Sequence, residues 1–131
     1  MTILVVEDEA RIASFVRKGL QARGYEAETV GTGGAALARL AHGGVALVVL
    51  DLGLPDLDGI EVLQRVRRDG SRVPIIVLKA RNDAEDEIRE LELSIDGYIT
   101  KPFAFDRLAE CVRAGLANGK PPDPVREGNS P

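Results

Sequence analysis

The sequence has one cysteine, one histidine, no tryptophan and few other aromatic residues in 131 positions. A single cysteine excludes an internal disulfide, and with one histidine it cannot supply the ligands typical of structural zinc. No apolar run approaches the ~18 residues that a membrane helix needs, and no secretion signal is recognisable. The net charge of −4 gives no reason to expect nucleic acid or an anionic membrane as a direct partner. These features predict a cytoplasmic protein that reaches DNA only through another domain.

One short apolar run organises the chain. Residues 45–50 are all apolar and half of them are β-branched, which is typical of a central parallel strand buried on both faces. Asp51 follows the run directly, and Gly53, Pro55 and Gly59 then break the chain. In an open α/β sheet the ligand crevice lies at the carboxyl ends of the strands. Asp51 is therefore the candidate reactive residue.

Similar short runs and helical patterns alternate along the rest of the chain. Strands are expected at residues 2–6, 25–30, 45–51, 73–78 and 97–100, and helices at about 12–23, 32–42, 59–68, 82–94 and 105–117. In the first helix, Phe15 is expected on the buried face. Right-handed crossovers then predict an α/β fold with a five-stranded parallel doubly wound sheet in the order 2-1-3-4-5. Residues 1–117 would form this domain, and residues 118–131, rich in proline, a disordered tail or a truncated interdomain linker.

Three carboxylates are expected to converge in the crevice. Glu7 and Asp8 end the first strand and Asp51 ends the third, and these two strands are neighbours in the predicted order. Each close pair of such charges costs roughly 4 kcal/mol at about 4 Å, so cations must lie among them. Lys101, after the fifth strand, is one, and Mg²⁺ is the obvious second. A carboxylate facing Mg²⁺ and a lysine can act as a nucleophile toward a phosphoryl group, which predicts an aspartyl phosphate.

Three stretches, residues 3–9, 50–59 and 98–103, together carry a family resemblance. Over residues 2 to about 117 the chain resembles a response-regulator receiver domain of the OmpR/PhoB class, which has a flavodoxin-like fold. Each motif alone is weak, whereas three in order at strand ends are specific. The resemblance implies a signal-receiving domain, not an enzyme, in a two-component system. A winged-helix DNA-binding output domain usually follows in this class.

The resemblance also implies roles for the crevice residues. A histidine kinase would transfer a phosphoryl group to Asp51. The metal would be held by Asp8, Asp51 and the carbonyl of Gly53, with Glu7 supporting it through water. Lys101 would contact the phosphoryl group. Phosphorylation would switch a homodimer surface made of the helix at 82–94, the strand at 97–100 and the last helix.

Lys79 departs from the family pattern, which places threonine or serine at the end of this strand. The family hydroxyl binds the phosphoryl oxygen and draws the aromatic switch residue, here Tyr98, inward. An added ammonium should weaken Mg²⁺ binding. It could pair with Asp51 and make it a poorer nucleophile, or extend to solvent and leave a working site with a weaker switch. In both cases we expect the coupling to Tyr98 to be lost, with phosphorylation slow or poorly transmitted. The alternative function is a degenerate receiver, an interaction module independent of phosphorylation.

The expected dimer surface also departs from the family. Glu87 stands where a basic residue is usual and Arg107 where an acidic one is, so this pair of charges looks exchanged. Gly97 and Cys111 replace a usual aspartate and arginine, so another pair looks deleted. An exchanged pair could bridge identical subunits and reject related proteins. The plainer interpretation is drift at exposed positions, where an ion pair contributes about 0–1 kcal/mol.

Two functions on similar sheets compete with this interpretation. A phosphohydrolase with an aspartyl nucleophile would need Asp-x-Asp, and the residue two after Asp51 is Gly53. A flavodoxin-like FMN carrier would bind phosphate after the first strand, where acidic residues 7–9 would repel it. Both are disfavoured by the residues present.

Overall fold

A computed structural model describes residues 1–80 and 95–117 of the chain. Five parallel strands form one sheet in the order β2-β1-β3-β4-β5, which confirms the predicted fold class and strand order. The helix expected at 82–94 and the tail at 118–131 lie outside the described residues. The strands are β1 (Thr2–Val6), β2 (Glu26–Val30), β3 (Val45–Asp51), β4 (Ile75–Lys79) and β5 (Gly97–Thr100), and the described helices are α1 (Ala10–Ala22), α2 (Gly33–Ala41), α3 (Gly59–Arg68) and α5 (Phe105–Ala117).

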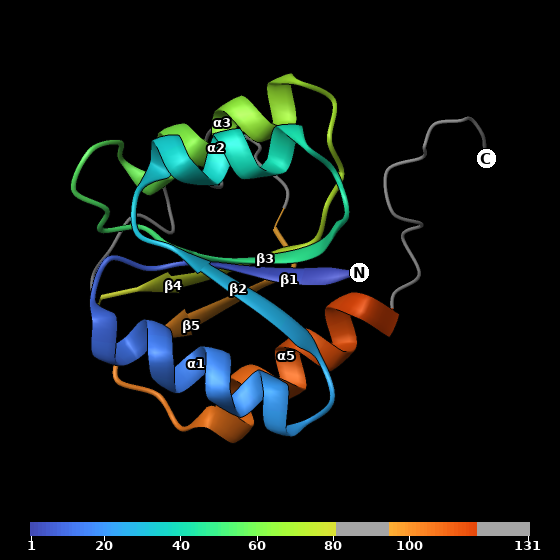
Figure 1. The fold of residues 1–131 in the computed structure, drawn as a ribbon. Helices are drawn as coiled ribbons and strands as arrows, with labels where there is room; N and C mark the ends of the chain where they lie inside the picture. Colours follow the sequence, from blue (N-terminus) through green and yellow to red (C-terminus); the bar gives the residue numbers. More distant parts are fainter. Residues whose placement is uncertain (81–94, 118–131) are drawn as a thin grey trace.

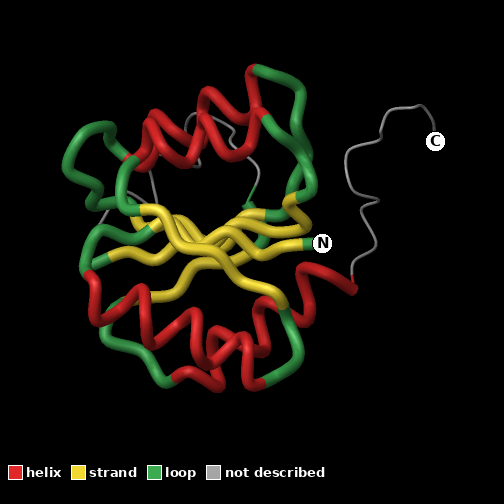
Figure 2. The backbone as a smooth tube through the Cα atoms, viewed as in Figure 1, coloured by secondary structure: helices red, strands yellow, loops and turns green. Residues whose placement is uncertain are grey.

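The described helices cover both faces of the sheet. Helices α2 and α3 lie on one face and α1 and α5 on the other, with the strands between them (Figures 1 and 2). Alternate residues of β1 enter opposite cores: Leu4 and Val6 pack with α2 and α3, whereas Ile3 and Val5 pack with α1 and α5. This double burial explains why the central strands are almost continuously apolar. Among the described helices, none is long and apolar enough to span a membrane.

Helix α1 corrects one prediction, because Phe15 does not lie on its buried face. Its exposed fraction is 47 %, while Val16 and Leu20 on the same helix are fully buried. The Phe15 ring packs beside the helix against Phe103 and Phe105, with ring centres 6.2 Å and 5.9 Å away. The periodicity placed the apolar face of α1 correctly, but the predicted face was wider than the buried one, since the sheet covers only its centre.

Strand β4 is displaced from the predicted range by hydrogen bonds at both ends. It begins at Ile75, whose N–H donates to Oδ2 of Asp96 at 2.9 Å. It extends to Lys79, whose carbonyl accepts from the N–H of Lys101 at 2.8 Å. This second contact fixes the start of the loop after β5.

The predicted cap of α2 is confirmed, because the Thr32 hydroxyl accepts from the N–H of Ala35 at 3.1 Å.

Candidate functional site

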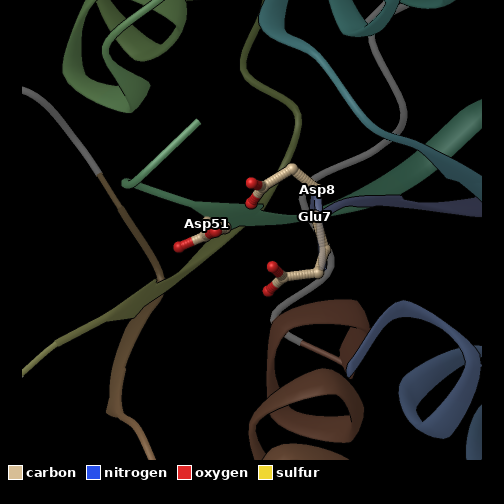
Figure 3. Close-up of side chains that lie close together, drawn as sticks. All are labelled: Glu7, Asp8 and Asp51. Carbon is tan, nitrogen blue, oxygen red and sulfur yellow. The ribbon is translucent and has the colours of Figure 1, made fainter. Parts of the chain in front are cut away.

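The three predicted carboxylates meet at the carboxyl ends of β1 and β3. The two strands pair with Val6 opposite Leu50, so the residues that follow are brought together. One oxygen from each of Glu7, Asp8 and Asp51 lies within 4.8 Å of the others, and the side chains gather around one point (Figure 3). Glu7 and Asp51 are almost fully buried, whereas Asp8 is exposed. The site is therefore a buried acidic pair with one carboxylate at its mouth.

Lys101 supplies the predicted positive charge. Its Nζ lies 3.0 Å from Oε1 of Glu7 and 3.2 Å from Oδ1 of Asp51. Burial of the ammonium lowers its pKa, but the contact with Glu7 and the charge of Asp51 outweigh this, so the pKa is raised. Lys101 therefore stays charged over the whole neutral range, and one cation serves two buried carboxylates.

Glu7 is the carboxylate of the site whose pKa is raised. Burial raises its pKa from 4.5 to about 7, against the opposing effects of Lys101 and of the Glu9 N–H, which donates to Oε2 at 3.1 Å. The negative charge of Asp51 raises it further. Near neutral pH, Glu7 is therefore poised between its protonated and ionised forms.

The titration of Glu7 predicts how stability depends on pH. Because the folded state holds this proton more tightly than the unfolded state, stability is fully present below about pH 4.5 and is lost as pH rises through about 7. With divalent metal removed, we expect a loss on the order of 1–3 kcal/mol between about pH 5 and pH 8. In Glu7→Gln this slope should largely disappear.

The measurement is chemical denaturation across this pH range in the presence of a chelator. Glu26→Gln, which removes an exposed carboxylate from the edge strand β2, is the matched control and should keep the wild-type slope. If stability depends on pH equally in the wild type and in Glu7→Gln, the pH dependence does not come from the titration of Glu7.

The residues present fit a hard divalent cation. Within the described residues, Oε1 of Glu7 is buried and no donor meets it at a hydrogen-bonding angle, although the Lys101 ammonium is close. Three carboxylates gathered around one point, two of them buried, are a donor set that suits Mg²⁺. Asp8 and Asp51 could hold the ion together with the carbonyl of Gly53, with Glu7 behind them. The exposure of Asp8 leaves a route for the ion to enter.

The loop after β3 is folded tightly back onto the site. The Gly53 N–H donates to Oδ1 of Asp51 at 3.1 Å, and the Gly59 N–H donates to the Leu52 carbonyl at 3.1 Å. A Cβ at Gly59 would lie 2.5 Å from Cα of Leu52 and 2.9 Å from the Asp51 carbonyl oxygen. Glycine is therefore required for the start of α3 to pack against the end of β3.

Lys79 ends β4 beside the site, with Thr100 opposite it on β5. Its exposed fraction is 9 %, which is low for a lysine extended into solvent. Among the described residues, the ion pair of Asp51 is with Lys101. The predicted effects of Lys79 on Asp51 and on Mg²⁺ stay predictions.

Tyr98, the predicted switch residue, is half-buried and packs on the core cluster that contains residues of α2 and α3.

The described residues of the predicted dimer surface lie on β5 and α5. Arg107 is exposed. Gly97 and Cys111 are neighbours within one chain, since a Cβ at Gly97 would lie 3.6 Å from Sγ of Cys111. Glu87 lies outside the described residues.

Asp56 is a structural residue that the sequence patterns did not single out. It lies in the loop after β3, and its carboxylate accepts from the N–H groups of Gly33 and Gly34 at the start of α2. The only local signal was the pair of glycines, which permits close approach at that turn. Its partner, more than twenty residues away in sequence, could not be identified from either segment alone.

Comparison with known proteins decides the family. Residues 3–113 match the family model of the response regulator receiver domain. The chain belongs to this family. The match covers the sheet, the acidic site and most of α5, so the receiver domain is the whole described fold.

The receiver domain has curated relatives among transcriptional regulators, in agreement with the predicted resemblance. It is 41 % identical to the transcriptional regulatory protein KdpE of Mycobacterium tuberculosis, over 98 % of this chain and 58 % of that protein. It is 40 % identical to the transcriptional regulatory protein BasR of Escherichia coli, over 88 % of this chain and 52 % of that protein. The chain thus spans little more than half the length of these relatives.

Solved structures agree with the fold. The receiver domain of the Francisella response regulator 1452 aligns with a TM-score of 0.83 and 30 % identity, over 91 % of this chain and 98 % of that one. A CheY-like receiver domain protein from Methanospirillum hungatei aligns with a TM-score of 0.81 and 28 % identity, over 89 % of this chain and 94 % of that one.

Proposed function

We propose that this receiver domain accepts a phosphoryl group on Asp51 from a histidine kinase. The observation that carries the proposal is the joint placement of Asp51, two further carboxylates and Lys101 at one sheet edge. A domain that only bound partners would have no physical need for a buried acidic pair, whose repulsion costs stability. The domain would be modified once per signal and is not proposed to be an enzyme.

The transfer is a displacement at phosphorus. A carboxylate oxygen of Asp51 forms the new O–P bond while the P–N bond to the donor imidazole breaks, and the imidazole leaves with the bonding pair. Oδ1 of Asp51 is already engaged by Gly53 and Lys101, which makes Oδ2 the candidate nucleophile. Lys101 stays charged and would stabilise negative charge on the equatorial phosphoryl oxygens. Bound Mg²⁺ would supply further neutralisation of that charge.

The chemical nature of the product tests this proposal. Protein loaded from a small phosphodonor would carry an acyl phosphate, which hydroxylamine cleaves, whereas serine or threonine phosphoesters resist it. We expect hydroxylamine to remove the phosphoryl group completely. A phosphoryl group that resists hydroxylamine would mean that another side chain is modified.

Lys79 should set how tightly Mg²⁺ binds. Replacing it with threonine removes one positive charge from the edge of the crevice, so we expect the affinity for Mg²⁺ to rise roughly three- to tenfold at low ionic strength. Lys79→Met, which removes the charge without adding a hydroxyl, should show the same gain. Calorimetric titration measures both. Unchanged affinity in both variants would mean that the ammonium does not act on the metal site.

The second candidate function is an interaction module independent of phosphorylation. It is favoured by the lysine at the end of β4, in place of the hydroxyl that the resemblance leads us to expect. In this case Lys79→Thr would be needed before any phosphorylation was seen.

The partners follow from the proposed role. A sensor histidine kinase would be the phosphoryl donor, and a homodimer through β5, α5 and the segment containing Glu87 would be the output state. DNA would be contacted by a separate output domain, and the proposed location is the cytoplasm. The relatives named as transcriptional regulators support this context.

A further inference from the structure

Among the described residues, the hydrogen bonds that join the tip of the loop after β3 to another element come from a single side chain. Oδ1 of Asp56 accepts from the N–H of Gly33 at 2.8 Å, and Oδ2 accepts from the N–H of Gly34 at 2.9 Å. Both donors belong to the first turn of α2, where N–H groups have no partner within the helix. The two oxygens of one carboxylate thus clamp two consecutive amides.

Steric fit holds the same contact close. A Cβ at Gly33 would lie 2.8 Å from Cγ2 of Val62 and 2.9 Å from Cβ of Leu57, the residue after Asp56. The start of α2 can approach the loop only because glycine occupies this position. The Gly34 and Gly33 amides lower the pKa of Asp56 below its usual range, so the carboxylate stays ionised well into the acid range.

The clamp lies three residues from a candidate metal ligand. The ends of the loop are fixed elsewhere: the Leu52 N–H donates to the Leu78 carbonyl at 3.1 Å, and Asp58 caps α3 by accepting from Ile60 at 3.1 Å. Among the described residues, the hydrogen bonds that join residues 54–57 to another element are the two made by Asp56. Leu54 and Leu57 also pack against the core, so these two hydrogen bonds act together with apolar contacts to hold the loop that carries the Gly53 carbonyl.

We propose that Asp56 is a positioning residue that holds the Gly53 carbonyl in place for Mg²⁺ by fastening the loop to the amino terminus of α2. The inference rests on the proposed function, because it assumes a metal at the acidic site. Outer contacts that orient a metal ligand typically change affinity by about 10–100-fold when removed. The coupling is reciprocal, so metal binding should in turn strengthen the clamp.

The test compares Mg²⁺ dissociation constants, measured by calorimetry, among four proteins. Asp56→Ala removes the clamp, and Asp56→Glu keeps the charge but is one methylene too long for the same paired contact. Asp69→Ala removes an equal charge at the far end of α3 and is the control. We expect Asp56→Ala to bind about tenfold more weakly and Asp56→Glu at least about threefold more weakly, with Asp69→Ala within about twofold of the wild type. At saturating Mg²⁺ the phosphorylation rate of Asp56→Ala should return close to that of the wild type.

A second readout needs no variant. Amide hydrogen exchange at Gly33 and Gly34, followed by NMR, should slow about as much as the clamp favours the metal, roughly tenfold on addition of Mg²⁺. A purely structural contact would show no such response to metal.

The outcomes separate the two proposals. A wild type that binds no Mg²⁺ overturns the proposed function and the inference with it. A wild type that binds Mg²⁺, with Asp56→Ala binding equally well or with no slowing at Gly33 and Gly34, overturns the inference alone. If Asp56→Glu binds like the wild type while Asp56→Ala is weaker, the role is one of charge and the positioning proposal is wrong.

Discussion

Replacing Lys101 with alanine is expected to lower the free energy of unfolding by roughly 3 kcal/mol at neutral pH when no divalent metal is present. The variant leaves two carboxylates buried without their cation: the exposed fractions of the Glu7 and Asp51 side chains are 0 % and 5 %. Removing one partner of a buried ionic group costs far more than an exposed pair contributes, because the remaining charges stay desolvated. The same substitution should slow phosphorylation by about 100-fold or more, since it removes a preorganised cation.

The dependence on pH and metal makes this prediction specific. Protonation of Glu7, whose pKa burial raises to about 7, removes one of the two charges that Lys101 balances, so the loss of stability should shrink toward about pH 5. Added Mg²⁺ should restore part of the stability by replacing the missing positive charge. Chemical denaturation with and without Mg²⁺ measures both effects. Lys18→Ala, which removes an exposed lysine from α1, is the control and should change stability by less than about 0.5 kcal/mol. A loss below about 1 kcal/mol in Lys101→Ala at neutral pH would contradict the assignment.

Gly59→Ala should destabilise the domain by about 3 kcal/mol, although alanine is the better helix former. A Cβ at this position would meet Cα of Leu52 and the Asp51 carbonyl oxygen at 2.5 Å and 2.9 Å. Backbone atoms cannot move aside as the end of a side chain can, so the start of α3 or the end of β3 must shift. The shift would displace Asp51 and should reduce phosphorylation as well.

Gly31→Ala is the matched control for this steric effect. A Cβ at Gly31 would come no closer than 4.0 Å to Cα of Asp8 or the Glu7 carbonyl oxygen, which is ordinary contact. We expect its free energy of unfolding to stay within about 0.5 kcal/mol of the wild type. Equal stability of Gly59→Ala and Gly31→Ala would show that the close packing at Gly59 is not required.

The parts of the site that the sequence predicted follow from general rules. Residues at the carboxyl ends of neighbouring parallel strands must lie close together, so the order of the strands was enough to bring Asp51 to Glu7 and Asp8. The need to compensate three negative charges then pointed to Lys101, and the structure confirms its contacts with Glu7 and Asp51.

Other features depend on contacts that no local pattern indicates. The face of α1 was predicted from periodicity, but Phe15 lies beside that face, where its ring packs against those of Phe103 and Phe105. The start of β4 depends on Asp96, and the clamp made by Asp56 depends on amides in another helix. These contacts join residues distant in sequence, whereas composition and spacing report on neighbours along the chain.

Lys79 illustrates the same limit for function. The residue type predicted an added positive charge near the phosphoryl site, and the structure places it at the buried end of β4. Its effect depends on the balance between this charge, Lys101 and the metal. The affinity for Mg²⁺ reports on that balance, and the Mg²⁺ titrations of the Lys79 variants measure it.

Intact mass after incubation with a small phosphodonor tests the central claim most directly. The wild type and Asp51→Ala are each incubated with and without Mg²⁺. The account predicts that the wild type gains one phosphoryl group only when Mg²⁺ is present, and that Asp51→Ala gains none. A wild type that gains no phosphoryl group under any condition, or an Asp51→Ala variant that gains as much as the wild type, would contradict it.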